Sequence, residues 1–155
     1  MAKNKEPMNI QERPANDDDF DLTLAIKATS LRPYIEEIWG WDDAVQYAYH
    51  KENFAPENIR ILLIENQEFG YVETTEDDRE IFLVNLLIKK DFQKKGLGSL
   101  VMNRLWQKAV AGNKSLRLEV FKVNKKATAF YKKLGFQVSG ETELKFRMTK
   151  RSDRL

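Results

Sequence analysis

The hydrophobic and polar positions in the second half of the chain predict strands that alternate with amphipathic helices. Residues 80–88 are almost all apolar, which is typical of a central strand covered on both faces. The spacing becomes helical over residues 98–111, because apolar side chains recur at every fourth position from Leu97. Alternation predicts a strand over residues 115–120, and helical spacing returns over residues 124–134. The strand at residues 80–88, the helix at residues 98–111 and the strand at residues 115–120 are therefore expected to form a right-handed parallel crossover.

The first half is predicted to hold a short strand, two helices and two further strands. We expect the first strand over residues 8–13 and the first helix over residues 16–29. Pro33 suits the first turn of a second helix that runs to about Asn53, and Gly40 interrupts that helix. The two further strands of the first half are expected over residues 59–65 and 68–75. The second half is expected to end with two strands, over residues 136–139 and 143–149.

The order of these elements predicts a mixed α/β layer rather than a regular winding of strand, helix and strand. A length of 155 residues is that of one ordinary domain. The sequence has no internal repeat and no linker rich in Pro, Gly or Ser. We therefore expect a single domain over residues 9–150, with a flexible tail at residues 1–8 and a second tail at residues 151–155.

The composition excludes several kinds of chemistry. The chain has no cysteine, which excludes disulfides, thiolate metal sites and a cysteine nucleophile. With a single histidine, His50, a conventional zinc site is not expected, and no metal ligands are predicted. The longest apolar runs are far shorter than the roughly 20 residues that span a bilayer, and no secretory signal is visible. These features predict a cytoplasmic protein without a membrane partner.

The net charge of +2 hides an uneven distribution along the chain. Residues 1–80 contain 8 Lys or Arg and 19 Asp or Glu, a net charge of −11. Residues 81–155 contain 18 Lys or Arg and 5 Asp or Glu, a net charge of +13. A basic half suits an anionic ligand and an acidic half suits a cationic one, although solvated surface charge that merely varies by region gives the same totals.

The segment Gln93–Gly98 carries the most specific chemical signal. Its two glycines stand between the buried strand and the amphipathic helix, where backbone N–H groups and the helix N-terminus form an anion site. The absence of Cβ atoms lets a phosphate approach the main chain closely. The segment lacks the final Gly-Lys-Ser/Thr of a P-loop and the third glycine of a dinucleotide-binding loop, so both are excluded. Four lysines lie in or beside it: Lys89, Lys90, Lys94 and Lys95.

Residues 88–98, with Gln93 and its two glycines, resemble the acetyl-CoA loop of the GNAT N-acetyltransferase superfamily, whose pattern is Gln/Arg-x-x-Gly-x-Gly/Ala after the fourth strand. A second block agrees with this resemblance, because Asn124 is followed by Phe130-Tyr131 and Gly135-Phe136. Together the two blocks span about residues 80–138. The resemblance implies a GNAT-like α/β (α+β) fold, in which helices flank a mixed, mostly antiparallel sheet of six or seven strands.

The resemblance also implies that acetyl-CoA is the cosubstrate. In the family, the backbone of the strand end hydrogen-bonds the pantetheine arm, and the turn holds the pyrophosphate through its amides. Asn124 and Tyr131 are seven residues apart, so one helix face presents both to a long ligand. The expected cofactor-binding residues are Leu86, Leu87, Ile88, Gln93, Lys94, Lys95, Gly96, Leu97, Gly98, Ser99, Asn124 and Tyr131.

Amine acetylation needs a neutral amine, a polarised thioester carbonyl and a proton for the departing thiolate. In the family, the tyrosine at the position of Tyr131 points at the thioester sulfur. Because a phenol with a pKa of about 10 can protonate a thiolate, Tyr131 is the candidate general acid, and simple helix packing is the alternative role. Glu73 and Glu80 flank the central strand pair, and both are candidates for the base. Without cysteine, direct attack by the amine in a ternary complex is expected.

The amine acceptor is expected to lie against the acidic half of the chain. Glu37, Trp39 and Trp41 combine a carboxylate with aromatic faces, which suits a protonated amine and its aliphatic stem. Two core tryptophans beside a solvated acidic face are the alternative interpretation. Asn85 is polar within an apolar strand and faces either the substrate or the core, while His50 has the sequence context of a structural residue. The expected partner is a small-molecule or peptide amine. The oligomeric state, including a homodimer, stays open.

Two other functions stay open at this point. A catalytically silent module would bind acetyl-CoA but release no CoA in the presence of an amine. A nucleic-acid-binding protein would use the basic half, although no motif for a specific nucleic acid is visible and the acidic half opposes it.

Overall fold

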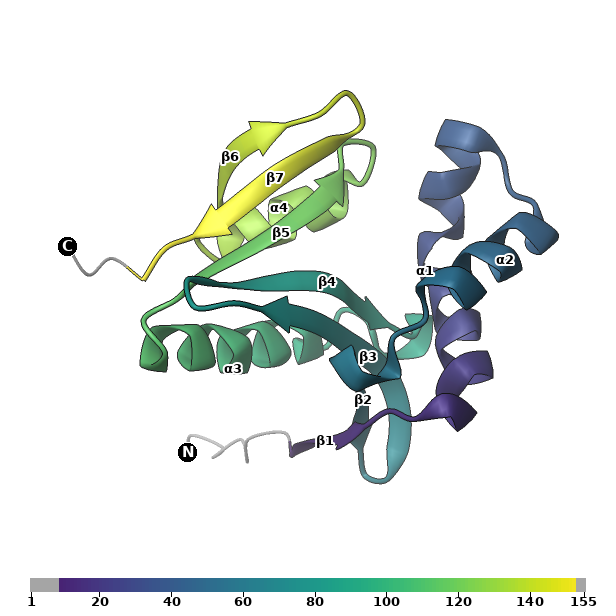
Figure 1. Ribbon diagram of the computed structural model, residues 1–155, viewed down its shortest axis with the longest axis horizontal. Coiled ribbons are helices and arrows are strands. Elements are labelled where there is room, and N and C mark those ends of the chain that lie inside the picture. Colours follow the sequence, from purple (N-terminus) through teal and green to yellow (C-terminus); the bar gives the residue numbers. More distant parts are fainter. Residues whose placement is uncertain (1–8, 153–155) are drawn as a thin grey trace, which may run out of the picture.

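A seven-stranded sheet in the order β1-β2-β3-β4-β5-β7-β6 runs through the computed structural model, which describes residues 9–152 (Figure 1). The strands are β1 (Ile10–Pro14), β2 (Ile59–Ile64), β3 (Gln67–Glu76), β4 (Glu80–Ile88), β5 (Ser115–Phe121), β6 (Gln137–Glu141) and β7 (Lys145–Lys150). The α-helices are α1 (Phe20–Trp39), α2 (Asp43–Asn53), α3 (Leu97–Ala111) and α4 (Lys125–Lys133). Short 3₁₀ helices are found at Asp17–Asp19, Pro56–Asn58 and Lys90–Phe92. The predicted tail at residues 1–8 and residues 153–155 of the second tail lie outside the described residues.

Both faces of the sheet are covered by helices, and each face has its own hydrophobic core. Helices α3 and α4 pack on one face over Phe69, Val72 and Leu118. Helix α1 packs on the other face, where Ile26 meets a cluster that includes Tyr71. All neighbouring strands are antiparallel except β4 and β5, which are parallel and joined through α3. The expected mixed, mostly antiparallel sheet and its parallel crossover are therefore confirmed.

Helix α1 runs without a break through Pro33, so the prediction that a second helix begins there was wrong. A proline inside a helix removes one hydrogen bond, here to the carbonyl of Thr29. Both residues are exposed, so water can satisfy that carbonyl, while Ile26 and Ile35 bury the helix on either side of the proline. The helix ends instead at Gly40, whose φ of +79° lies in the left-handed region.

The pairing between β4 and β5 is short. Residues 80–83 of β4 pair with residues 115–118 of β5, and no pairing continues beyond Leu83 within the described chain. On its other side β4 stays paired with β3 as far as Ile88. The two central strands therefore separate toward the end of β4, and the β5-facing edge of residues 84–88 has no strand beside it. Within residues 9–152, no helix is both long enough and apolar enough to cross a bilayer.

Strands β3 and β4 approach each other most closely at Gly70. A Cβ atom built on Gly70 would overlap the carbonyl oxygen of Leu87 and crowd the backbone of Ile88. The backbone of both strands would have to move, because the obstructing atoms belong to the main chain rather than to a flexible side chain. This glycine thus fixes the separation of β3 from the end of β4.

Replacing Gly70 with alanine is expected to lower the free energy of unfolding by about 3 kcal/mol, since overpacking against backbone cannot relax cheaply. Denaturant unfolding followed by circular dichroism measures this change. Gly140→Ala is the matched control, because the nearest atom to a Cβ at Gly140 is 3.9 Å away. Equal stability of the two variants would show that the close approach at Gly70 is not a structural constraint.

Candidate active site

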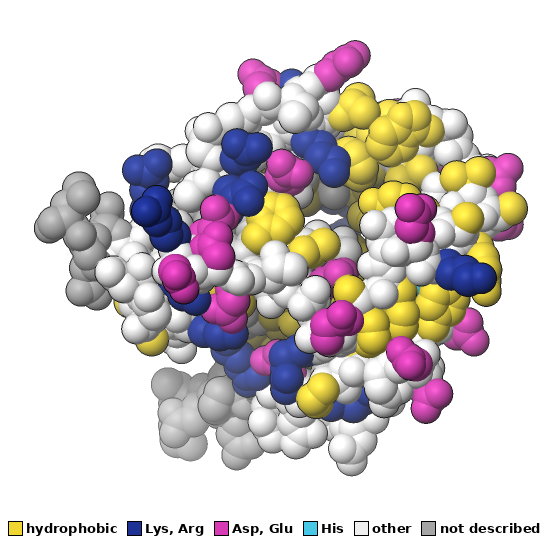
Figure 2. All heavy atoms as spheres, in the orientation of Figure 1, with side chains coloured by type: hydrophobic (Ala, Val, Ile, Leu, Met, Phe, Trp, Pro, Cys, Tyr) yellow, Lys and Arg dark blue, Asp and Glu magenta, His cyan; other side chains and the backbone are white. Residues whose placement is uncertain are grey.

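A cleft of about 560 Å³ opens where β4 and β5 separate. Its walls come from α1, the end of β4, the segment that leads into α3, and α4. The space-filling view shows a hollow between the apolar side chains over α1 and the part of the molecule over β4 and β5 (Figure 2). The predicted cofactor-binding residues that line the cleft are Leu86, Leu87, Ile88, Gln93, Lys94, Gly96, Leu97, Gly98, Ser99, Asn124 and Tyr131.

The end of β4 offers main-chain groups to this cleft. Leu86, Leu87 and Ile88 pair with β3 on one side, while the opposite edge has no strand beside it in the described chain. An extended ligand can therefore add to this edge in the manner of a further strand. The side chain of Gln93 donates a hydrogen bond of 2.8 Å from Nε2 to the carbonyl of Ile88, and this bond fixes the segment after the strand to its end.

The start of α3 forms the predicted anion site. Gly96 precedes the helix with a φ of +80°, and no side chain caps the helix there. The backbone N–H of Leu100 bonds the carbonyl of Gly96, so the N–H groups of the three residues between them lie in the uncapped first turn. These donors and the positive end of the helix dipole suit a phosphate.

Two details of this segment differ from the sequence interpretation. A Cβ atom on Gly98 would meet the Phe130 and Ile88 side chains at 3.3 and 3.4 Å, so this glycine also makes room for protein packing at the wall of the cleft. Lys95 does not line the cleft but a separate groove beside the turn between β2 and β3, where its ammonium lies 5.9 Å from the centre of the Phe92 ring. Lys126 lines the cleft and was not predicted.

Helix α4 supplies Asn124 and Tyr131, which line the cleft together as their seven-residue spacing predicted. The Asn124 side chain caps the helix by accepting a hydrogen bond of 3.0 Å from the N–H of Ala127. The Tyr131 ring packs edge-on against Phe130 and Phe136. Burial raises the pKa of Tyr131 above its ordinary value of 10.0, so its hydroxyl keeps its proton at neutral pH.

Buried Glu73 and half-buried Asn85 form a polar pair on the α1 side of the sheet. They are register partners in β3 and β4, and Asn85 Nδ2 donates a hydrogen bond of 3.0 Å to Glu73 Oε1. Burial raises the pKa of Glu73, whereas the hydrogen bond from Asn85 and the charge of Lys27 act in the opposite direction. Lys27 of α1 is itself desolvated, which lowers its pKa. Asn85 directly precedes Leu86, so the pair lies beside the cleft without lining it.

The structure does not bring Glu80 to the cleft, so the prediction of Glu80 as a candidate base was wrong. Glu80 is the first residue of β4, eight residues before Ile88, which places it roughly 26 Å away along the strand. Its carboxylate accepts a hydrogen bond from Nε of Arg117 on β5. The side chain therefore secures the paired end of the two strands, opposite to the end at which they separate.

The three predicted acceptor residues do not lie together. Trp39 packs edge-on against Phe121 at a centroid distance of 5.8 Å, at the end of β5 that leads to Asn124. Trp41 lies in a different groove between α1 and α2, where its Nε1 donates to Asp43. Glu37 is exposed on the last turns of α1. The continuous helix and the turn at Gly40 separate these side chains.

Helix α1 contributes the cleft residues that sequence reasoning missed. Ser30, Leu31 and Tyr34 line the cleft from α1. Their spacing is that of one helix face, but the prediction ended the first helix at Thr29 and began a second one at Pro33. Ser30 and Leu31 were therefore placed in a connection and Tyr34 in a different helix. The signal that would have found them is this helical spacing, if it had been followed across Pro33 as part of one helix.

His50 lies outside the cleft, in the aromatic packing between α1 and α2. Its ring is buried beside Phe20 and Phe54, and its Nε2 is 3.0 Å from Thr23 Oγ1. Burial lowers the pKa of His50 to about 4, so it is neutral at physiological pH. This environment supports the predicted structural role. Among residues 9–152, no three His, Cys, Asp or Glu side chains come together as metal ligands.

Solved structures with the same fold cover nearly the whole chain. The PaiA N-acetyltransferase from Thermoplasma acidophilum, solved in complex with coenzyme A, matches with a TM-score of 0.77 and 18% identity over 93% of this chain and 99% of that chain. The ribosomal-protein-S18-alanine N-acetyltransferase from Escherichia coli matches with a TM-score of 0.66 and 18% identity over 95% and 96% of the two chains.

A third structure is Arabidopsis thaliana Naa50 in complex with the bisubstrate analogue CoA-Ac-MVNAL. It matches with a TM-score of 0.66 and 16% identity over 91% of this chain and 97% of that chain. The family model for the acetyltransferase (GNAT) domain matches residues 56–138, which include the end of β4, the anion site and all of α4. The chain belongs to the GNAT acetyltransferase family.

Proposed function

We propose that this protein transfers the acetyl group of acetyl-CoA to a primary amine by direct attack in a ternary complex. The observation that carries this proposal is the single cleft in which the uncapped start of α3, the free edge of β4 and the Tyr131 side chain meet. Each of these three parts suits a different portion of one long thioester ligand.

The residues of the cleft fit such a ligand from one end to the other. The N–H groups at the start of α3 suit the pyrophosphate, together with Lys94, which precedes α3, and Lys126 of α4. The free edge of residues 86–88 suits the amide groups of the pantetheine arm, and Asn124 lies where that arm passes α4. The solved relative from Thermoplasma acidophilum, which holds coenzyme A, supports this assignment.

The proposed chemistry uses Tyr131 and Glu73 as proton donor and acceptor. Acetyl-CoA supplies an acetyl group activated as a thioester. The amine nitrogen forms an amide bond to the acetyl carbon while the carbon–sulfur bond breaks, and Tyr131 Oη gives its proton to the leaving sulfur. Glu73, acting through a water molecule or directly, takes the proton that the amine loses. A raised pKa makes Glu73 a stronger base than an exposed carboxylate.

The acceptor is proposed to be a small-molecule or peptide amine that enters beside α1. Ser30, Leu31 and Tyr34 form the α1 wall, and farther along α1 Trp39 packs against Phe121 at the end of β5. The Glu37 carboxylate is proposed to attract a cationic amine, because it is exposed on the last turns of α1. The bisubstrate analogue in Naa50 and the protein substrate named for the Escherichia coli enzyme support a peptide acceptor.

The direct test measures acetyl-CoA binding by calorimetry and CoA release with a thiol reagent across a panel of amines. The absence of cysteine means that the protein itself adds no thiol signal. Binding and amine-dependent release are both expected. Binding without release by any amine would identify a silent module, and wild-type protein that ignores millimolar acetyl-CoA would refute the proposal.

Gly96→Val serves as the variant arm of the same test. Valine at a φ of +80° is strained, so the start of α3 is expected to reorganise and acetyl-CoA affinity to fall at least tenfold. Gly140→Val is the control on β6, where the atoms nearest to an added Cβ are 3.9 Å away. Equal affinities of the two variants would remove the anion-binding role from this turn.

Tyr131→Phe is expected to lower kcat about 100-fold or more and to change the KM for acetyl-CoA only slightly, because it removes a proton donor that acts in the transition state. Steady-state kinetics with an active amine measures both constants. Tyr34→Phe removes another phenol from the same cleft and is the control. If both variants keep the wild-type kcat, Tyr131 has only a packing role.

Asn85→Ala is expected to raise the pKa of the Glu73 carboxyl further, because the lost hydrogen bond stabilises the carboxylate. Carbon-detected NMR titration of the side-chain carboxyl follows this pKa. The acidic limb of the kcat/KM profile should move to higher pH by the same amount if Glu73 is the base. Asn103→Ala on the exposed side of α3 is the control, and a Glu73 pKa that is unchanged or lowered in Asn85→Ala contradicts the assignment.

A further inference from the structure

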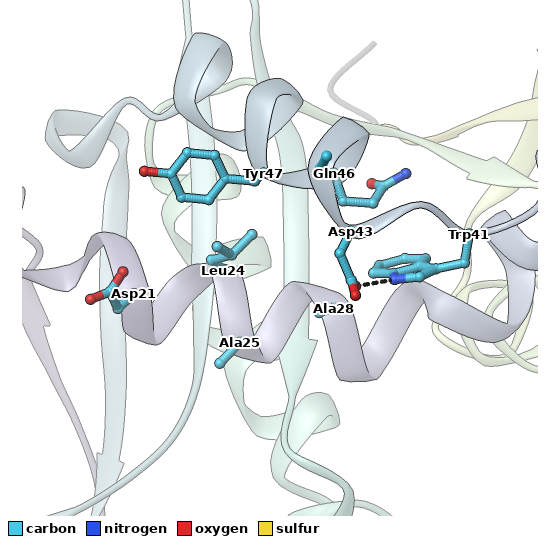
Figure 3. A pocket seen from close by; sticks show the side chains of 9 residues that line it. Asp21, Leu24, Ala25, Ala28, Trp41, Asp43, Gln46 and Tyr47 are labelled. Atoms are coloured by element: carbon cyan, nitrogen blue, oxygen red, sulfur yellow. Dashed lines mark hydrogen bonds between the residues drawn. The ribbon is translucent and has the colours of Figure 1, made fainter.

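A second groove, of about 460 Å³, lies between α1 and α2 and takes no part in the proposed reaction. Leu24, Ala25 and Ala28 of α1 form its floor, nearly opposite the buried Ile26 on the helix. Trp41 and Tyr47 stand over this floor from the α2 side (Figure 3). The groove is therefore apolar at its base and aromatic along its walls.

The surface around this groove is unusually apolar for a solvent-facing surface. The described chain exposes six large hydrophobic side chains, and four of them lie between residues 39 and 49. Figure 2 shows the corresponding apolar area on the side of the molecule formed by α1 and α2. Continuous exposed apolar surface marks a site of interaction. The four residues are Trp39, Val45, Tyr47 and Tyr49, of which Tyr47 lines the groove and the other three lie outside it.

The charges around the groove are mostly negative. Asp21 and Asp43 are the charged residues that line it. Residues 17–53 contain nine Asp or Glu but only three Lys or Arg. Of these three, Lys27 of α1 is half-buried near Glu73 and Arg32 lies beside Glu36, which leaves Lys51 near the end of α2. A negative rim repels nucleic acids and anionic lipid surfaces and attracts a cationic polypeptide.

The chain itself shows how a cation binds here. The Arg32 guanidinium lies 5.3 Å from the centre of the Trp41 ring, and the Trp41 Nε1 donates a hydrogen bond of 2.7 Å to Asp43 Oδ1. The indole is thus held in place with a carboxylate beside it (Figure 3). An aromatic face next to a carboxylate binds both the stem and the charge of a Lys or Arg side chain.

We propose that the α1–α2 groove is a docking site for a basic amphipathic helix of a partner protein. Its leucine-like side chains would pack on Leu24 and Ala28, where small neighbouring residues allow a close approach. Its Lys or Arg side chains would meet Asp21 and Asp43. Asp43 lies beside Ala28 in Figure 3, and residues 21 and 28 are roughly 10 Å apart along α1, which corresponds to basic residues about seven positions apart.

A synthetic helix tests this proposal. The probe is a fluorescent peptide, acetylated and amidated at its ends, with leucine at helix positions i, i+3, i+4 and i+7 and lysine elsewhere. Binding is measured by fluorescence anisotropy. Asp43→Asn and Tyr47→Ser are each expected to weaken binding at least tenfold. Glu52→Gln and Tyr49→Ser are matched controls on the exposed surface of α2 outside the groove and should bind as wild type does.

The Ala25→Lys variant tests the groove with a substitution that the fold tolerates. Ala25 is an exposed helical position on the groove floor, so lysine is tolerated there while it blocks the groove and repels the peptide. Loss of binding in this variant, with acetyl-CoA affinity unchanged, supports the docking site whether or not the protein transfers acetyl groups. Wild-type affinity in Ala25→Lys overturns the proposal.

Three further outcomes would also overturn it. Equal weakening in the two control variants would mean that the peptide binds the surface without using the groove. Equal binding of a peptide in which glutamate replaces lysine would remove the electrostatic basis. Sedimentation of wild type and Ala25→Lys identifies a competing occupant, because an oligomer that this substitution dissociates would assign the groove to a second copy of the chain.

Discussion

The cleft depends on one constraint: β4 pairs with β5 over four residues and then leaves it. The register between β3 and β4 shifts at the same place, because Glu73 pairs with Asn85 and Thr74 pairs with Leu83, which leaves Val84 as an extra residue. A bulge of this kind bends its strand and increases the twist. It lies one residue beyond the last β4–β5 pair, so the bend and the separation of the strands have the same local origin.

The separation also determines where polar groups are buried. Beyond the bulge, Asn85 faces Glu73 on the α1 side, and α1 adds Lys27 to the same environment. A carboxylate at this depth costs free energy unless neighbouring groups stabilise it, and here an amide hydrogen bond and a nearby ammonium do so. Tyr131 approaches from α4 on the other side of the sheet. Acid and base candidates therefore reach the region from opposite faces of one strand end.

The sequence predicted the parts that depend on local pattern. The bounds of β4 match the apolar run, and the spacing of Asn124 and Tyr131 placed them together on one wall. The strand register shows that the candidate base Glu73 lies beside the cleft, whereas Glu80 lies at the opposite end of β4. No local sequence pattern contains this register. The continuation of α1 through Pro33 required the burial of Ile35, a tertiary contribution that outweighs the local preference of proline. Ser30, Leu31 and Tyr34 were missed for the same reason.

Helix α1 connects the two surfaces of this protein. Its residues 30, 31 and 34 face the cleft, whereas residues 24, 25 and 28 face the outer groove, about a third of a turn away around the same axis. Because the helix continues to Trp39, its end reaches Phe121 at the end of β5, while the turn at Gly40 returns the chain to place Trp41 in the outer groove. A break at Pro33 would remove both contacts at once. An unbroken α1 is therefore the element through which the acidic half of the chain takes part in both the cleft and the groove.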